Sequence, residues 1–261
     1  MKQFLSNELL RGLLLAAAFT ACGNVDDKRP VVIVDGSSTV FPVSDAVAAQ
    51  FQRAQPVKVD VKVPVGVSGT RGGFRKFCSG KVDVAGASRP ITAEEVELCA
   101  KGHVDYVELP IAYDALAIVV NAANGWARDI TTEELAKMWQ PAAEGKILRW
   151  NQVRSEWPDK ELHLYGAGVD SGTYDYFTRA VVGVEHSSRP DFVSSEDDNL
   201  LVEKLEADPL ALGFFGYAYF QKAGARLRAR SSDNGNPQDG QGAIAPSAEA
   251  VRKGTYQPLS R

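Results

Sequence analysis

The sequence has few cysteines, few histidines and no excess of positive charge. Its 261 residues include three cysteines and three histidines, and the formal net charge is −4. A negative net charge excludes the broad basic surface with which proteins hold nucleic acid. The histidines His103, His163 and His186 are scattered along the chain, so no metal site is expected from them.

Long hydrophobic runs are also missing beyond the N-terminus, so no later segment is expected to span a membrane. At the N-terminus, Lys2 and Arg11 precede the apolar run 13–19, which is followed by Thr20-Ala21-Cys22. This pattern predicts a signal peptide over residues 1–21 and a bacterial lipobox, with a diacylglycerol and palmitate anchor on Cys22 and a polar tether over 22–30. A plain signal peptide with an incidental cysteine is the alternative.

Export places the protein in an oxidising compartment, at the periplasmic or outer face of a membrane. Without Cys22 the chain keeps an even number of cysteines, Cys78 and Cys99. An even number of cysteines in an exported protein predicts a disulfide. The bond between them closes a loop of about 20 residues.

The length and composition fit a globular protein with two α/β lobes. Hydrophobic residues make up 44% of the chain and charged residues 24%, which is ordinary for such a protein. Apolar, strand-like runs alternate with amphipathic, helix-like runs, and this alternation predicts parallel sheets. The expected strands cover residues 31–34, 57–65, 82–87, 104–110, 115–120, 162–165 and 211–217.

Three hydroxyl-rich turns stand between such strands and the helices that follow them. They are Asp35–Thr39, Gly66–Thr70 and Asp170–Thr173. The first turn of a helix has unpaired backbone N–H groups, and with the helix dipole these favour an anion. One such turn is most often only a helix cap. Three of them, all at the carboxyl ends of predicted strands, indicate a shared pocket for a small oxyanion.

The motifs Gly36–Pro42, Gly66–Thr70, Asp83–Ile91 and Asp170–Thr173 together resemble the phosphate-binding proteins of bacterial phosphate ABC importers. The resemblance extends over nearly the whole chain after Cys22. It implies a type II periplasmic-binding-protein fold with two hinged lobes. It also implies that the chain closes on inorganic phosphate and delivers it to the transmembrane subunits of an ABC permease, with no cofactor and no catalysis.

The resemblance carries phosphate contacts onto the three turns, and Arg89 is added as a candidate ligand. The first turn supplies Ser38, Thr39 and Val40, and the second supplies Ser68, Gly69 and Thr70. The complete candidate set is Ser38, Thr39, Val40, Ser68, Gly69, Thr70, Arg89, Asp170, Ser171, Gly172 and Thr173.

Two positions depart from the best-known family members. Arg89 stands where they have an aspartate that accepts the proton of hydrogen phosphate, and Ala167 stands where they have an arginine. Arg89 is expected to bind phosphate bidentately, the alternative being a salt bridge to a neighbouring carboxylate. Asp170 is either a substitute proton acceptor or a helix N-cap. Arg71 is a second candidate ligand, or a residue on a solvated helix face.

The resemblance also predicts the lobes. Lobe 1 is expected to combine residues 31–116 with 222–261, and lobe 2 to cover 117–221. Family members continue past the Pro-Leu-Ser-Arg motif at which this chain stops, so a fragment and a shortened member are both open.

Other functions fit the motifs less well. Gly66-Val67-Ser68-Gly69 is not the nucleophile elbow of a serine hydrolase, because Thr70 replaces the final glycine. No P-loop sequence occurs, and Ser171 fills the third glycine position of a dinucleotide fingerprint. The remaining alternative keeps the fold and changes the role: a receptor or sensor for arsenate, sulfate or another oxyanion.

Overall fold

The computed structural model describes residues 30–54, 63–236, 238 and 242–260. The predicted signal peptide, the Cys22 anchor, nearly all of the tether and most of the predicted strand 57–65 lie outside these residues. Contacts divide the chain into Met1–Pro30 and Val31–Arg261, and the elements below belong to the second unit. No helix in the described ranges is long and apolar enough to cross a membrane.

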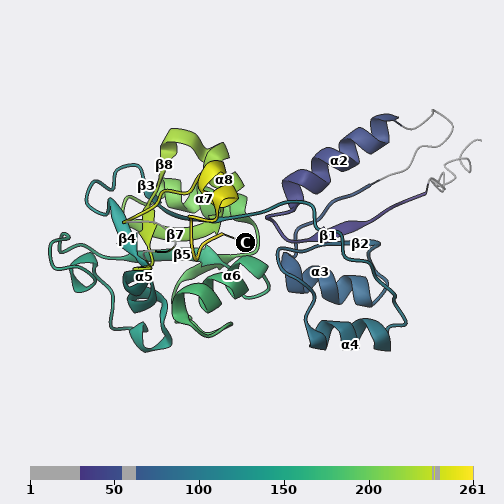
Figure 1. The fold of residues 1–261 in the computed structure, drawn as a ribbon, viewed down its shortest axis with the longest axis horizontal. Coiled ribbons are helices and arrows are strands. Elements are labelled where there is room, and N and C mark those ends of the chain that lie inside the picture. The colour runs from purple at the N-terminus through teal and green to yellow at the C-terminus, as the bar shows by residue number, and fades with distance from the viewer. Residues whose placement is uncertain (1–29, 55–62, 237, 239–241, 261) are drawn as a thin grey trace, which may run out of the picture. The chain divides into compact units, whose positions relative to one another are not determined.

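The described residues before β3, 30–54 and 63–115, form two short parallel strands and three helices (Figure 1). β1 (Val34–Gly36) pairs with β2 (Val84–Gly86). The three helices are α2 (Phe41–Ala54) and α3 (Gly69–Cys78), which lie between the two strands in the sequence, and α4 (Ala93–Lys101), which follows β2. Thr92 caps α4 in a capping box with Glu95, and the spacing Thr-x-x-Glu is the sequence pattern typical of such a helix start. The predicted disulfide is also confirmed, because Cys78 at the end of α3 is bonded to Cys99 in α4.

Glycines let β1, β2 and α3 approach each other closely. Gly36 has a φ of +141°, and a Cβ on it would lie 2.1 Å from the carbonyl oxygen of Gly86. A Cβ on Gly73 in α3 would lie 2.7 Å from the Cα of Gly36. Only glycine fits such contacts, so the glycine-rich start of α3 is held against the end of β1.

The larger sheet has the strand order β6-β5-β7-β3-β8. β5 (His163–Ala167) runs parallel to β6 (Val193–Ser195) and β7 (Ala211–Gly216), but β3 (Leu116–Asn121) runs antiparallel to β7 and to β8 (Leu227–Ala229). The expectation of parallel sheets is therefore wrong for β3. The chain enters β3 from residues 103–114, which form no helix or strand, so the geometry that makes βαβ units parallel does not apply to it.

Five further helices and a second strand pair accompany this sheet in the described residues. β4 (Asp129–Thr131) pairs in parallel with β9 (Ser231–Asp233). β6 (Val193–Ser195) lies within the polar stretch 187–198, whose composition is typical of a loop. The helices are α5 (Thr132–Trp139), α6 (Gly172–Phe177), α7 (Asp198–Ala207), α8 (Tyr217–Ala223) and α9 (Ala248–Lys253), and α6 continues as a π-helical turn over Thr178–Val182.

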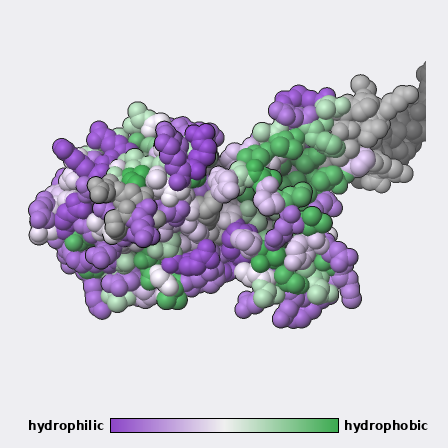
Figure 2. Space-filling view, viewed as in Figure 1, coloured by the Kyte–Doolittle hydropathy of each residue, from purple (hydrophilic) through white to green (hydrophobic). Residues whose placement is uncertain are grey.

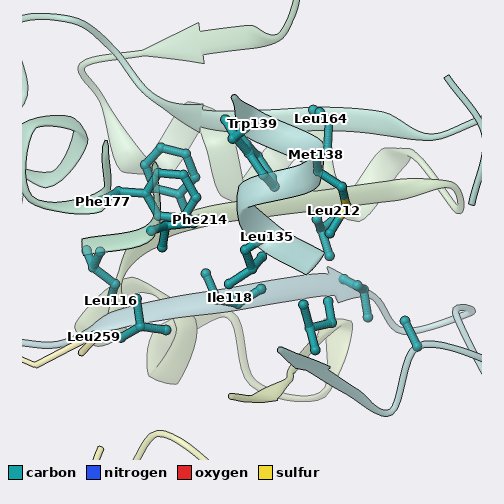
Figure 3. Close-up of a cluster of buried hydrophobic side chains, with 14 of the residues drawn as sticks. Leu116, Ile118, Leu135, Met138, Trp139, Leu164, Phe177, Leu212, Phe214 and Leu259 are labelled. Atoms are coloured by element: carbon teal, nitrogen blue, oxygen red, sulfur yellow. The ribbon is translucent and has the colours of Figure 1, made fainter. Parts of the chain in front are cut away.

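Aromatic rings fill the main hydrophobic core (Figure 3). The rings of Phe177 and Phe214 are stacked with centroids 3.7 Å apart, and Trp139 meets both edge-on at 5.2 and 5.5 Å. All three side chains are fully buried. Because Phe177 lies in α6 and Phe214 in β7, this packing fixes the helix that follows the third hydroxyl-rich turn.

The C-terminal segment packs with the larger sheet. β8 pairs with β3, Tyr256 donates its hydroxyl to Leu116 O over 2.9 Å, and Leu259 O accepts from Leu116 N over 2.8 Å. Figure 3 shows Leu259 beside Leu116. Within the segment 222–261, which was predicted to belong to lobe 1, β8 pairs with β3 and β9 (Ser231–Asp233) pairs with β4 (Asp129–Thr131).

The predicted strand 104–110 does not form. Residues 103–114 have no assigned helix or strand, and Val107, Leu109, Ile111 and Tyr113 are 82%, 77%, 62% and 85% exposed. Figure 2 also shows hydrophobic surface over the part that carries α2 and β1.

Candidate functional site

Each of the three hydroxyl-rich turns precedes a helix. Residues 37–40 connect β1 to α2, Ser68 is the N-cap of α3, and Ser171 is the N-cap of α6. The Ser171 hydroxyl accepts a hydrogen bond from Thr173 N over 3.1 Å, whereas Ser68 makes no such capping bond. The local sequences thus form the expected helix starts, and the question is whether the three meet.

The first and third turns meet through their threonines. Thr39 Oγ1 lies 3.2 Å from Thr173 Oγ1. Next to this pair, Tyr219 in α8 donates its hydroxyl to Ser38 O over 2.7 Å and so anchors the first turn. Val40 N bonds to Ser37 O over 3.2 Å, so Val40 is engaged within its own turn.

The second and third turns meet at Gly172. A Cβ on Gly172 would lie 2.7 Å from Thr70 Oγ1 and 2.5 Å from Ser88 Oγ. Thr70 and Ser88 are themselves linked, with their hydroxyl oxygens 3.1 Å apart. The absence of a side chain at residue 172 therefore lets two hydroxyl-bearing segments close against the start of α6.

Several buried hydroxyls in these turns have no hydrogen bond among the described residues. They are Ser37 Oγ, Ser38 Oγ and Ser68 Oγ, and Ser37 and Ser38 are only 3% and 1% exposed. A buried hydroxyl without a partner costs about 1–3 kcal/mol, so such groups call for a ligand or water. Ser37 and Ser88 were not among the sequence-predicted residues, although each lies in a motif that the sequence indicated.

Arg89 makes ion pairs with two carboxylates. Its Nη1 and Nη2 donate to the two oxygens of Glu95 over 2.7 and 2.8 Å, and its Nε donates to Asp175 Oδ2 over 2.8 Å. Burial favours the neutral guanidinium, but the hydrogen bonds to Glu95 and Asp175 outweigh burial and raise the pKa of Arg89 above its usual value. In the structure Arg89 therefore forms salt bridges with neighbouring carboxylates, which was the alternative to a phosphate ligand. The salt bridge to Asp175 links the end of β2 to α6.

Asp170 also pairs with arginine. Arg75 of α3 donates to Asp170 Oδ1 and Oδ2 over 3.0 and 2.7 Å, and the Asp170 carbonyl accepts from Arg71 N over 2.9 Å. The hydrogen bonds from Arg75 lower the pKa of Asp170. Since Ser171 is the N-cap of α6, the capping role weighed for Asp170 is not found; its carboxylate instead joins α3 to the third turn.

Arg71 faces a group of three side chains that could otherwise hold a metal ion. Asp175, Glu185 and His186 bring possible ligand atoms within 4.8 Å of one another. Arg71 Nη2 lies 3.0 Å from both His186 ring nitrogens and 3.5 Å from Asp175 Oδ1. A guanidinium at these distances supplies the positive charge that a metal would bring.

Two carboxyl groups near the turns carry no sequence signal. Asp198, at the start of α7, is completely buried, and its Oδ2 accepts from Gly216 N over 3.2 Å. Burial raises the pKa of Asp198 to about 7. Glu196 accepts from Asp170 N over 3.0 Å, and burial raises the pKa of Glu196 as well.

The histidines do not support a catalytic serine in the described part of the chain. His163 contacts Asp208 and Glu161, and His186 contacts Asp175 and Arg71. Among residues 30–54, 63–236, 238 and 242–260, no hydrogen bond joins a histidine ring to Ser68 or Ser171. The three turns therefore offer hydrogen-bond donors that suit an anion.

The chain is similar to known proteins over nearly its whole length. The PBP superfamily domain matches residues 24–261. Protein SphX of Synechocystis sp. is 46% identical over 257 residues, which cover 98% of this chain and 74% of that protein. The phosphate-binding protein PstS of Staphylococcus saprophyticus is 32% identical over 254 residues, covering 95% and 74%. An ABC-type phosphate transport receptor from Vibrio cholerae has a similar structure, with a TM-score of 0.58, 23% identity and coverage of 88% and 84%.

Proposed function

This chain belongs to the PBP superfamily domain family, and we propose that it captures inorganic phosphate outside the cytoplasm and delivers it to the transmembrane subunits of an ABC permease. The names of its relatives support this proposal, since one is a phosphate-binding protein and another a phosphate transport receptor. In the α/β fold of this chain, the three hydroxyl-rich turns precede α2, α3 and α6.

One observation carries the proposal: three turns that are distant in sequence meet at their helix starts. Thr39 contacts Thr173, and Gly172 contacts Thr70 and Ser88. A tetrahedral oxyanion needs donors from several directions, and hydroxyls with helix N-terminal N–H groups supply them. The buried hydroxyls without partners belong to the same turns.

The proposed binding residues are those predicted from the sequence with two additions. Ser37 and Ser88 join the set because of their positions at the turns. Arg89 and Asp170 are proposed to act through their ion pairs, which join α6 and its turn to α3, to the end of β2 and to α4. Each charge-assisted hydrogen bond to the anion contributes about 1.5–3 kcal/mol, so a few suffice for tight binding.

No chemical step is part of this function. The ligand is bound, enclosed and released, and only the loaded form is proposed to dock on the permease.

The anchor on Cys22 would hold the protein at the membrane. Mass spectrometry of the protein purified from membranes tests this, because Cys22→Ser should abolish the acyl mass and release the chain into the soluble fraction.

Titration calorimetry with inorganic phosphate tests the proposed site. Ser68→Ala removes a buried hydroxyl that lacks a well-aligned hydrogen bond in the described structure, although it lies near the Asp35 carboxylate. We expect about tenfold weaker binding or more, with little change in the melting temperature. Ser232→Ala is the matched control, because Ser232 Oγ is also buried without a partner but lies in β9. Equal phosphate affinities of the Ser68→Ala and Ser232→Ala variants would contradict the site.

The same titration addresses the alternative ligands. Phosphate should bind with one site per chain and sulfate far more weakly. Saturable binding of sulfate with no response to phosphate would instead support a receptor for another oxyanion.

A further inference from the structure

Asp198 is a carboxyl group without a cation in a place that excludes water. Its side chain is 0% exposed, and no ion pair reaches it within the described ranges. An ionised carboxylate in such a place is costly unless it is paired or protonated. Its only hydrogen bond in the described residues comes from Gly216 N to Oδ2, over 3.2 Å.

Asp198 lies directly beside the first hydroxyl-rich turn. A Cβ on Gly216 would lie 3.3 Å from Asp198 Oδ2 and 3.5 Å from Thr39 Oγ1, so both atoms are on the same side of Gly216. The Ser38 hydroxyl is close enough to favour the ionised form of Asp198 and so to oppose the rise in its pKa. Even so, neither Ser38 Oγ nor Asp198 Oδ1 has a hydrogen bond among the described residues.

We propose that Asp198 shares one proton with the bound oxyanion and thereby selects oxyanions that carry a hydroxyl, such as phosphate and arsenate, over sulfate. This inference rests on the proposed function of the site. When Asp198 is ionised, it accepts a hydrogen bond from the protonated oxygen of phosphate. Sulfate has no proton at neutral pH, so it binds only when Asp198 has taken up a proton and donates it.

The surroundings of Asp198 keep this proton exchange near neutral pH. Burial raises its pKa to about 7, and the negative charges of Asp114 and Asp197 act in the same direction. Tyr219 faces it from α8, and the pKa of this phenol is raised by burial and by Asp198. Above neutral pH the ionised form dominates, so selection against sulfate should strengthen as the pH rises.

Titration calorimetry with phosphate and sulfate at pH 8 tests the proposal. Asp198→Asn keeps the size of the side chain but replaces the acceptor with an amide that donates. We expect the ratio of phosphate to sulfate affinity to fall at least about tenfold in this variant. Asp197→Asn is the matched control, because it removes the neighbouring charge while asparagine preserves the N-cap of α7. The ratio of phosphate to sulfate affinity in this control should stay within about threefold of the ratio in the original protein.

A second measurement needs no variant. If sulfate binding requires a proton on Asp198, the sulfate affinity of the unmodified protein should rise about tenfold for each pH unit between pH 8 and the pKa of Asp198. An unchanged selectivity ratio in Asp198→Asn, or equal sulfate affinities at pH 8 and pH 6, would overturn the inference while phosphate binding by the unmodified protein stands. Loss of phosphate binding by the unmodified protein would overturn the proposed function itself.

Discussion

Thr39 and Thr173 are 134 positions apart in the sequence, and their hydroxyl oxygens lie 3.2 Å apart in the fold. The contact joins the turn before α2 to the turn that opens α6. Two side chains that can each donate and accept are thus held at one point by separate helices. The first and third hydroxyl-rich turns therefore meet in the fold although they are distant in the sequence.

Replacing Gly172 with alanine should weaken phosphate binding. The new Cβ would lie 2.5 Å from Ser88 Oγ and 2.7 Å from Thr70 Oγ1, so one of these segments has to move. We expect a loss of about tenfold or more in affinity by titration calorimetry. Gly125→Ala is the control, because a Cβ there meets nothing within 4 Å. Equal affinities of the two variants would show that close approach at residue 172 does not matter.

Breaking the contact between Arg75 and Asp170 should reduce phosphate affinity by a small, salt-sensitive amount. The pair is bidentate, but 53% of the Arg75 side chain is exposed. We therefore expect a coupling between Arg75 and Asp170 of about 0.2–1 kcal/mol in the free energy of phosphate binding. A double-mutant cycle with Arg75→Ala and Asp170→Ala, measured at low and high salt, isolates this coupling. A coupling of zero at low salt would exclude a role for the pair in holding the closed site.

Removing the disulfide should destabilise the protein without touching the turns. Cys78 and Cys99 are separated by 21 positions, and the loop-entropy argument gives about 3 kcal/mol for a loop of this size. The variant with Cys78→Ala and Cys99→Ala should show this loss in urea unfolding. Phosphate affinity, measured at urea concentrations well below the unfolding midpoint, should stay within about twofold of the original value. A larger loss of affinity would mean that the arrangement of α3 and α4 depends on the disulfide.

Acid should weaken the structure through Asp191. Hydrogen bonds from Arg189 lower the pKa of Asp191 to about 2, so its stabilising effect is present above the ordinary pKa near 3.8 and is lost as the pH falls toward 2. Since 34% of its side chain is exposed, we expect about 1 kcal/mol. The difference in unfolding free energy between the original protein and Asp191→Asn should be largest near pH 5 and shrink below pH 4. Asp159→Asn, at an exposed arginine pair, is the control and should show a smaller effect. A difference that stays constant with pH would exclude the ion pair as its cause.

The sequence predicted the parts of the fold that depend on neighbouring residues. The capping box at Thr92, the helix starts at Ser68 and Ser171 and the disulfide all follow from local patterns or from counting cysteines. The pairing of β3 and the position of the C-terminal segment did not follow. Strand direction depends on distant partners, and β3 has its partners in β7 and β8.

The candidate site shows the same division. Hydroxyl-rich turns are visible in the sequence because helix starts have characteristic residues. The partners of Arg89 are not visible in this way, since Asp175 is 86 positions away. Glu196 and Asp198 lie in a polar stretch whose composition indicates an exposed loop, and only the tertiary packing buries Asp198. Polarity alone therefore identifies neither the buried Asp198 nor the partly buried Glu196.

The central claim, that the three turns bind one oxyanion together, is tested most directly by a crystal structure with arsenate. Arsenic is located by its anomalous scattering, which separates the ligand from other additives. The account predicts one strong arsenic peak per chain, within hydrogen-bonding reach of Thr39, Thr70 and Gly172. An arsenic peak at only one turn, or none near any of them in a protein that binds phosphate, would contradict it.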